Sequence, residues 1–378
     1  MSTNITTELL RVDPNVIRFP KDATMPEIEP SETLTNLEKG VKILQAETPI
    51  AFPTETVYGL GASALSTPAV KGIYAAKNRP ADNPLIIHIS SVDQLERKLL
   101  FNTSIPDIYR PLIEKFWPGP LTILLPVPEN TNISSSCTVG QSTFAVRMPS
   151  NPIARSLIAL SDIPLAAPSA NASTKPSPTR ASHVYHDLQG RIPLILDGGP
   201  CDVGVESTVV DGLTDPPMLL RPGGVSLEEI RKYGGERWQN IQLAKASADK
   251  NEKVRTPGMK YKHYSPRAPV ALFINPTDSE SRVKEFISQF EPTPQRVAVL
   301  TSRAFGEPVV QAVQEHCQDV TVLSLGTSGA EISRNLFAML REVDEQGMDL
   351  IVVEGIDETE EGLAVMNRLK KAASTIIN

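Results

Sequence analysis

The sequence has few cysteines, and this shortage excludes two classes of protein. Its 378 residues include 3 cysteines, Cys137, Cys201 and Cys317, and none of them forms a Cys-x-x-Cys pair. Cysteines this far apart are not typical of a zinc module or of the disulfide framework of a small secreted domain. We therefore expect reduced thiols and a cytoplasmic location.

Positive charge and aromatic side chains are also scarce. The formal net charge is -7 and aromatic residues make up 5% of the chain. A broad nucleic-acid surface needs a basic face, and a platform for single strands needs stacked rings, so neither is expected. A small basic pocket remains compatible with this composition.

Long hydrophobic runs are missing as well. No apolar stretch reaches the ~20 residues that a membrane span needs. The first residues, MSTNITTELLRVDPNVIRFP, contain no apolar signal core. We expect no membrane association.

The chain is long enough for two domains. Residues 1–30 are polar and weakly periodic, which predicts a loosely attached arm. Residues 31–240 alternate short apolar strands with helical stretches, which predicts an α+β domain. The 33 prolines in the chain often stand at strand ends, so we expect a bent mixed sheet.

The second half of the chain has a different pattern. Residues 241–268 lose apolar periodicity and gain Lys, Pro and Gly, which indicates a linker. Residues 269–378 alternate continuous apolar strands with helices, which predicts a small parallel α/β domain of Rossmann-like build. Neither GxGxxG nor a Walker loop occurs in it, so no separate nucleotide site is indicated.

The stretch KNRPADNPLIIHI places two cations next to a predicted strand. A helix should begin at Thr67-Pro68 and end before Arg79, because Arg79 precedes a proline. Lys77 and Arg79 then lie at the end of this helix. They could be solvated charges, or they could form an anion site.

The stretch STFAVRMP reads as a strand with two faces. Thr143 and Arg147 share one face, with the small Ala145 between them. The simplest interpretation is a surface arginine, and the alternative is a ligand site. Arg221 stands in a similar position in PMLLRPGG, directly before two glycines that permit close approach to the backbone.

Two further stretches carry short polar side chains. An extended course through AAPSANASTKPSPT would align Ala167, Ser169 and Asn171, although a Ser/Pro-rich stretch is more often an ordinary loop. In FPTETVYGLGASA a strand leads into a Thr/Gly-rich turn that holds Thr56. Ser207 opens a later strand.

Other constellations look structural. His183 and His186 have helical spacing but no third ligand, so we expect no protein-built metal site. The sequence has no GxSxG motif and no Cys-His arrangement that would support an acyl-enzyme.

Taken in order, the motifs resemble one family. PIAFPTETVYGLG, KNRPADNPLIIHI, FWPGPLT, AVRMP, PSAN, DGGPCDVGVESTVVD and LLRPGG are similar to the YrdC-like domain of threonylcarbamoyl-AMP synthases. TPGMKYKHYSP and EGLAVMNRLKKAAS resemble the long, two-domain branch of that family. One departure is visible, because Ser173-Thr174 stands where the family has Ser-Gly.

The resemblance implies a nucleotidyltransferase. L-threonine, bicarbonate or CO2, and ATP would give L-threonylcarbamoyladenylate and pyrophosphate. Other proteins would transfer the product to the tRNA adenosine beside the anticodon, so this chain itself should bind RNA weakly or not at all. Mg²⁺ would bridge the phosphates of ATP.

The resemblance and the chemistry together assign the site residues. Two anions must meet in the reaction, and fixed cations offset their repulsion. We assign this catalytic role to Lys77, Arg79 and Arg221. The residues expected to hold ATP are Arg79, Asn83, Thr143, Ala167, Ser169, Asn171, Ser177, Arg221, His263 and Tyr264. The residues expected to hold threonine are Thr56, His88, Arg147 and Ser207, with Arg147 pairing with its carboxylate.

One further expectation and two alternative functions complete this interpretation. The linker 241–268 should act as a lid, because an unstable adenylate needs shelter from water. A non-catalytic RNA-binding module is one alternative, and ATP-dependent release of pyrophosphate would discriminate against it. A carbamoyltransferase of the hydrogenase-maturation type is the other, but such chains add cysteine-rich zinc modules.

Overall fold

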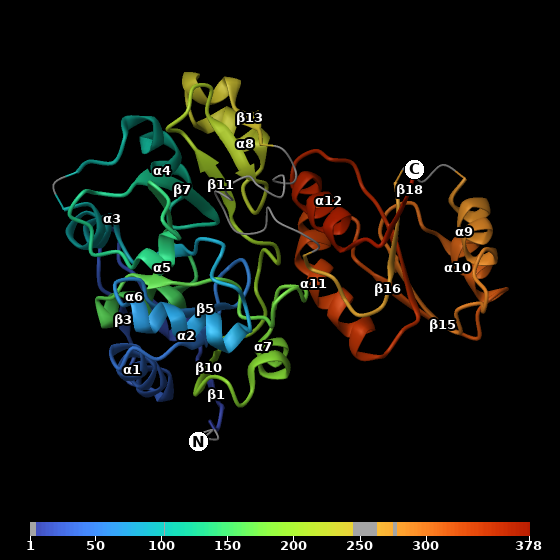
Figure 1. Cartoon of the computed structure of the whole chain (residues 1–378), viewed down its shortest axis with the longest axis horizontal. Helices are drawn as coiled ribbons and strands as arrows, with labels where there is room; N and C mark the ends of the chain where they lie inside the picture. Colours follow the sequence, from blue (N-terminus) through green and yellow to red (C-terminus); the bar gives the residue numbers. More distant parts are fainter. Residues whose placement is uncertain (1–4, 102, 245–262, 275–277) are drawn as a thin grey trace. The chain divides into compact units, whose positions relative to one another are not determined.

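The computed structural model describes residues 5–101, 103–244, 263–274 and 278–378 (Figure 1). The chain divides into two compact units. The first comprises residues 1–173 and 177–260, and the second comprises residues 174–176 and 261–378.

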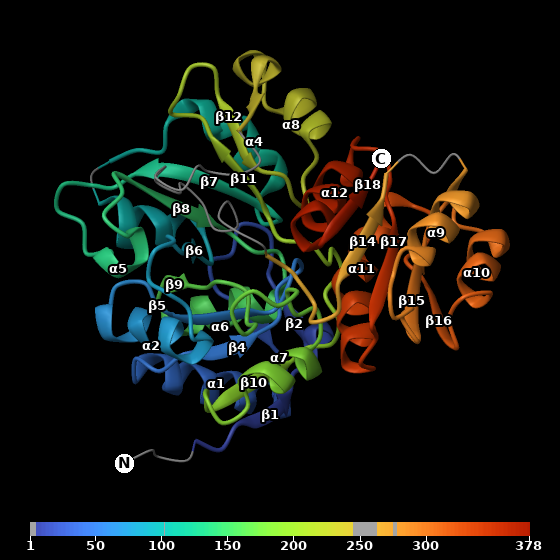
Figure 2. The same cartoon turned by 45° about the vertical axis from the view of Figure 1, so that its right-hand side comes forward.

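The first unit is built on one mixed sheet of 11 strands, several of them very short (Figure 2). Parallel and antiparallel neighbours alternate irregularly along it, as expected for a bent α+β sheet. In sheet order the strands are β1 (Glu8–Arg11), β10 (Leu194–Asp197), β4 (Ile50–Phe52), β5 (Gly59–Ser63), β9 (Leu165–Ala166), β6 (Ile86–His88), β8 (Thr143–Arg147), β7 (Leu121–Pro126), β11 (Thr208–Asp211), β12 (Met218–Arg221) and β13 (Gln242–Leu243).

Helices cover this sheet and close its core. They are α1 (Glu32–Gln45), α2 (Thr67–Lys77), α3 (Val92–Leu95), α4 (Arg110–Phe116), α5 (Ser135–Thr138), α6 (Pro152–Ser161), α7 (Ala181–Leu188) and α8 (Leu227–Tyr233). Shorter turns are η1 (Pro14–Val16), η2 (Glu96–Leu100), η3 (Asp107–Tyr109) and η4 (Glu236–Asn240). The main apolar cluster joins Leu37 and Leu44 of α1, Leu157 of α6 and Leu196 of β10, all fully or almost fully buried. Such burial is the main stabilising contribution to the unit.

The expectation of a loosely attached N-terminal arm is wrong for its described part. Strand β1 pairs in parallel with β10 and extends the main sheet. A short antiparallel pair, β2 (Ile17–Arg18) with β3 (Glu27–Ile28), follows it. The physical reason is that Val12 and Ile17 are buried against the same core as α1 and α6, which periodicity over so few residues does not reveal.

Strand β5 was expected to be a turn. It is a buried strand that pairs antiparallel with both β4 and β9. Glycine has low strand propensity, which hides the strand in the sequence. A Cβ on Gly61 would lie 2.5 Å from the Phe52 ring, so glycine is required here by close packing.

The second unit has a parallel five-stranded sheet, as the apolar runs of the sequence predict. In sheet order its strands are β16 (Asp319–Ser324), β15 (Arg296–Thr301), β17 (Leu350–Glu354), β14 (Val270–Phe273) and β18 (Thr375–Ile377). Its helices are α9 (Ser279–Ser288), α10 (Glu307–Gln314), α11 (Gly329–Glu345) and α12 (Glu361–Ala372). Helices α9 and α10 cover one face of the sheet and α11 and α12 the other (Figures 1 and 2).

Strands β15 and β17 are neighbours whose following helices lie on opposite faces of this sheet. In open α/β sheets such a switch point is the usual ligand crevice. Here Glu354, at the end of β17, fills it. Its buried carboxylate accepts four backbone N–H bonds, at 2.7–2.8 Å, from Ser302, Arg303, Ala304 and Phe305.

The residues 174–176 group with this second unit. The guanidinium of Arg341 on α11 donates from Nε and Nη2 to the carbonyl oxygen of Pro176, at 3.0 and 2.6 Å. Ser265 donates its N–H to the Thr174 carbonyl at 3.0 Å. Within the parts of the chain that the structure describes, no helix is both long and apolar enough to span a bilayer.

Candidate functional site

One row of residues across the main sheet contains two of the four residues expected at threonine, His88 and Arg147, together with Arg221. His88 of β6 lies opposite Arg147 of β8, and Arg147 lies opposite Thr122 of β7. Thr122 lies opposite Val209 of β11, which lies opposite Arg221 of β12. Directly opposed residues point to the same side of a sheet, so the two arginines and the histidine face one space.

Arg147 is 3% exposed, so the interpretation of it as a surface arginine is wrong. Its Nη1 donates to Thr56 Oγ1 at 3.0 Å. Its Nη2 lies 3.0 Å from Oε2 of Glu55, which is equally buried. The hydroxyls of Thr54 and Thr56 lie 2.8 Å apart and fix the turn that carries Glu55.

Arg221 links the two halves of the expected site. It is buried, and its Nε and Nη2 donate to the carbonyl oxygen of Ser207 at 3.1 and 2.9 Å. Its Nη2 also lies 3.1 Å from Ser207 Oγ, which in turn lies 2.8 Å from Thr122 Oγ1. Ser207, expected at threonine, and Arg221, expected at ATP, therefore meet in one buried network.

His88 is held neutral in this site. Burial, and then the positive charge of Arg147, lower the pKa of His88 to about 3. Its Nδ1 lies 3.2 Å from the Ile86 carbonyl oxygen. A neutral imidazole can accept or donate one hydrogen bond to a substrate hydroxyl without adding charge.

This lowered pKa predicts an acid-sensitive first unit. The unfolded chain binds a proton at His88 below pH 6.5, whereas the folded chain resists protonation down to about pH 3. Stability from this group is therefore complete at pH 8 and decreases as the pH falls through 6.5, by about 2 kcal/mol at pH 5. Denaturant unfolding of the wild type and of His88→Gln should diverge by that amount between the two pH values. The exposed His186→Gln should not alter the pH dependence, and parallel curves for the wild type and His88→Gln would refute the assignment.

Lys77 lies at the end of α2, but it is not a solvated charge. Its side chain is 2% exposed, and Nζ donates to the carbonyl oxygens of Ser169 and Asn171, the latter at 2.7 Å. Asn171 Oδ1 is a third neighbour, at 3.4 Å. In the described structure, Lys77 therefore holds the backbone of the Ser-Ala-Asn loop.

Four further residues expected at ATP belong to the first unit. Arg79 is partly exposed, with its guanidinium 6.0 Å from the Tyr74 ring centre. Asn83 is buried next to it, and its Oδ1 lacks a hydrogen-bond partner among the described residues. Thr143 begins β8, four residues from Arg147 and on the same face. Ala167 follows β9, and its N–H donates to the Ile86 carbonyl at 3.0 Å.

Two of the expected ATP residues belong to the second unit. The ring of Tyr264 is buried and packs 5.2 Å from the Phe337 ring. His263 lies 5.3 Å from it, ring centre to ring centre. The expected lid spans residues 241–268, and its residues 245–262 lie outside the described residues.

The backbone of the loop after Asn171 is strained at one residue. Thr174 adopts φ +74°, a region that glycine occupies freely and a β-branched residue only with strain. The departure from Ser-Gly noted in the sequence therefore falls on a position that favours glycine. Ser177 Oγ, three residues on, donates to Glu206 Oε1 at 2.5 Å.

Sequence reasoning assigned no role to three polar residues of this site, although it singled out the Thr/Gly-rich turn that contains Glu55. Glu55, Glu206 and Thr122 are all buried, at 7% exposure or less. Each is adjacent in sequence to a predicted site residue or strand, yet nothing in the local pattern distinguishes them. The sequence signal that could have indicated them is a charged or hydroxyl residue within, or directly before, an apolar strand segment, where polar side chains are rarely buried.

The described residues do not form a metal cage. Among them, no group of three or more His, Cys, Asp and Glu side chains is placed to hold a metal ion. A protein-built magnesium site therefore does not fit this part of the chain.

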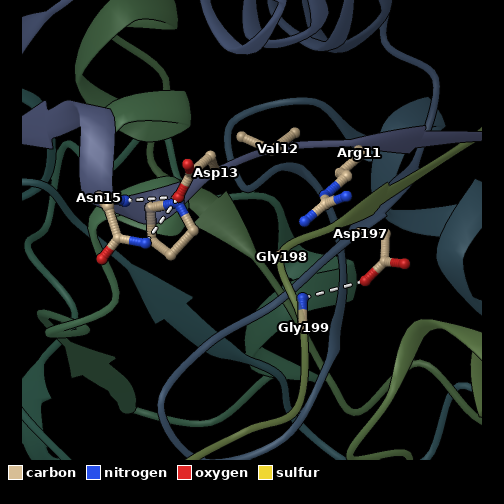
Figure 3. Close-up of a pocket in the computed structure, with 8 residues that line it drawn as sticks. Arg11, Val12, Asp13, Asn15, Asp197, Gly198 and Gly199 are labelled. Carbon is tan, nitrogen blue, oxygen red and sulfur yellow. Dashed lines mark hydrogen bonds between the residues drawn. The ribbon is translucent and has the colours of Figure 1, made fainter.

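A separate hollow of about 500 Å³ lies beside strands β1 and β10 (Figure 3). Its lining includes Arg11, Asp13, Asn15, Asp197 and Gly199, and none of these is an expected site residue. Asp13 accepts from the side chain of Asn15 at 2.8 Å, and Asp197 accepts from the N–H of Gly199 at 3.0 Å. Two of the polar side chains of this hollow, Asp13 and Asp197, are therefore already hydrogen-bonded within it.

Comparison with known proteins covers both units. Residues 42–223 match the family model described as "Telomere recombination", and residues 225–374 match the model described as "Threonylcarbamoyl-AMP synthase, C-terminal domain". The chain is 52% identical to the threonylcarbamoyl-AMP synthase of Schizosaccharomyces pombe, over 98% of each chain. It is 48% identical to that of Pyrococcus abyssi, over 86% of this chain and 90% of the relative.

A solved structure agrees with these relatives. The crystal structure of P. abyssi Sua5 complexed with L-threonine superposes with a TM-score of 0.82 at 43% identity. The match covers 98% of this chain and 99% of that one. At this identity and coverage the likeness extends over the whole two-unit architecture.

Proposed function

The chain belongs to the threonylcarbamoyl-AMP synthase family, and we propose that its buried arginine row makes L-threonylcarbamoyladenylate from L-threonine, bicarbonate or CO2, and ATP. The observation that carries this proposal is the juxtaposition of Arg147 and Arg221 on one face of the sheet, bridged by Thr122 and Ser207. Two fixed cations in a buried site suit a reaction between two anions.

Threonine occupies the Arg147 end of the row. The guanidinium can bind the carboxylate with two parallel hydrogen bonds, which a surface lysine could not match in geometry. Thr56, Ser207 and neutral His88 surround it with hydrogen-bonding groups of no net charge. That environment suits a small polar amino acid.

ATP occupies the side that Arg221, Arg79 and Asn83 share. The ammonium of threonine loses a proton to solvent, the free amine adds to CO2 and loses a second proton to give a carbamate, and a carbamate oxygen then attacks the α-phosphate with release of pyrophosphate. The arginines offset the charge that develops on the leaving group, and positioning supplies the rest. Lys77 acts by holding the loop of Ser169 and Asn171.

The proposed limits of the domains follow the sequence. We assign to catalysis residues 31–240 together with β1 and β13, which pair with the same sheet, and residues 269–378 to the α/β domain. The part of the expected linker 241–268 that follows β13 closes over the site. The linker's role rests on its composition alone, since Pro257, Lys260 and His263 combine turn chemistry with phosphate-seeking side chains. The product passes to the proteins that modify tRNA, and the three buried free thiols fit a cytoplasmic setting.

Mass spectrometry of the product tests the function directly. Full-length protein incubated with threonine, bicarbonate and ATP should form the threonylcarbamoyl-adenylate and one pyrophosphate per adenylate. Threonine labelled with ¹⁵N should shift the mass of the product by one unit, and omitting bicarbonate should abolish it. Pyrophosphate release that is independent of threonine would refute the proposal.

A further inference from the structure

Glu55 is a buried carboxylate whose hydrogen bonds are incomplete. It is 5% exposed, and neither Oε1 nor Oε2 has a hydrogen-bond partner among the residues that the structure describes. Among the described residues it forms an ion pair with Arg147, whose Nη2 lies 3.0 Å from Oε2. A buried charge usually pairs and also satisfies its remaining lone pairs, so the exception requires a reason.

The position of Glu55 is rigidly set by the backbone on both sides. Its own carbonyl oxygen accepts the N–H of Val203 at 2.8 Å, and the carbonyl of Thr56 accepts the N–H of Gly204 at 3.1 Å. Loop 203–204 leads directly to Ser207, another residue of the threonine end. A carboxylate held this firmly faces the same space as the Arg147 guanidinium.

The pair has the charge pattern of an amino-acid receptor. In a zwitterionic α-amino acid, a single carbon separates the ammonium from the carboxylate. Glu55 and Arg147 present the two opposite charges at a comparable spacing of 3.0 Å. Thr56 and His88 beside them add no charge, because the pKa of His88 is lowered to about 3, and the second cation on this face is Arg221.

We propose that Glu55 binds the α-ammonium of threonine while Arg147 binds its carboxylate. The ammonium supplies the hydrogen-bond donors that Glu55 lacks, and charge-assisted bonds of this kind are stronger than neutral ones. The inference rests on the proposed placement of threonine at Arg147, and it adds a residue that binds the amino group.

A consequence is selection against acids that have no amino group. Such a molecule would bring its carboxylate to Arg147 and leave Glu55 buried and unpaired, with like charges close together. Carbamoylation also removes the positive charge of the nitrogen, so Glu55 favours threonine over the product. Glu55 would therefore help to select the substrate and also favour departure of the product.

Two ligands separate recognition of the ammonium from recognition of the carboxylate. L-threonine has both groups, whereas (R)-3-hydroxybutyrate keeps the carboxylate and the hydroxyl but lacks the amino group. The dissociation constants of both are measured by calorimetry on the full-length wild type, on Glu55→Gln, and on Asp197→Asn as a matched neutralised carboxylate. Thermal melts of the three proteins confirm that each is folded.

The wild type should bind threonine at least about 30-fold more tightly than the hydroxy acid. Glu55→Gln should reduce this ratio at least about tenfold. The variant should bind threonine more weakly than the wild type does, and should bind the hydroxy acid equally tightly or more tightly. Asp197→Asn should keep the wild-type ratio. Equal weakening of both ligands would mean that Glu55 only orients Arg147, and would overturn the proposal.

Two other outcomes also count against it. If the wild type binds both ligands with equal dissociation constants, the protein does not recognise the ammonium. This comparison uses the wild type alone. If Glu55→Gln binds threonine as the wild type does, Glu55 is not its receptor. Product formation is scored separately, so loss of the ligand preference with normal synthesis is distinguishable from failure of the proposed function.

Discussion

Lys77→Met is expected to lower adenylate formation about 100-fold and to lower the melting temperature of the first unit as well. In the wild type, Lys77 Nζ donates to the buried carbonyl oxygens of Ser169 and Asn171. Both would lose this charged donor in the variant. A buried acceptor left without its partner costs about 1–3 kcal/mol, and each kcal/mol corresponds to roughly 2–4 °C in a unit of this size. The sequence predicted an anion site at Lys77, with a solvated helix end as the alternative, and on either interpretation the melting temperature would hardly change.

The control for this experiment lies on the same helix. Lys71 on α2 is exposed, so Lys71→Met removes the same charge without removing a buried contact. Tryptophan fluorescence reports on the first unit, because Trp117 and Trp238, which both lie within it, are the 2 tryptophans of the chain. A Lys77→Met protein that melts like the wild type but is inactive would instead place Lys77 at the phosphates.

Glu354→Gln is expected to destabilise the second unit by about 3–5 kcal/mol. The carboxylate accepts four consecutive backbone N–H groups, from Ser302 to Phe305. A glutamine offers one oxygen to these donors and turns its NH2 group toward the others. Because this unit has no tryptophan, amide hydrogen exchange in peptides from β15 and β17 is the appropriate measurement.

A bound anion should restore part of the stability that the second unit loses in Glu354→Ala, in which the side chain is truncated. Glu354→Ala leaves a ring of N–H donors at the switch point of the sheet, a geometry that binds sulfate or phosphate. Sulfate should therefore slow exchange in β15 of Glu354→Ala more than in the wild type. Glu345→Gln, an exposed carboxylate on α11, should behave like the wild type under both conditions. Unchanged exchange in Glu354→Gln would show that the four bonds contribute little.

This carboxylate also explains why the second unit carries no nucleotide motif. The crevice where a doubly wound sheet usually binds a ligand is already filled by a side chain of the same unit. The absence of GxGxxG and Walker patterns in residues 269–378 agrees with that packing. In the described part of the second unit, the Glu354 carboxylate thus occupies the backbone N–H groups that follow β15 at this switch point.

Local periodicity alone determined much of this protein. The strand that carries Arg147, the helix that ends at Lys77 and the parallel sheet of the second unit all follow from apolar spacing and from proline positions, which act within a few residues. The motifs were sufficient for the family, whereas the residues assigned to threonine and ATP stay predictions. These features depend on neighbours in sequence, which the chain displays directly.

Only the tertiary structure decided what the buried polar groups face. Lys77 meets carbonyl groups that are 92 and 94 residues away, and Arg147 meets Thr56 across 91 residues. Spacing along the chain shows that a side chain points inward, but not whether a ligand, a carboxylate or the backbone receives it. Glu55 lies beside Arg147, and β5 forms a strand despite its glycines, because distant segments pack there, and such packing has no local sequence pattern.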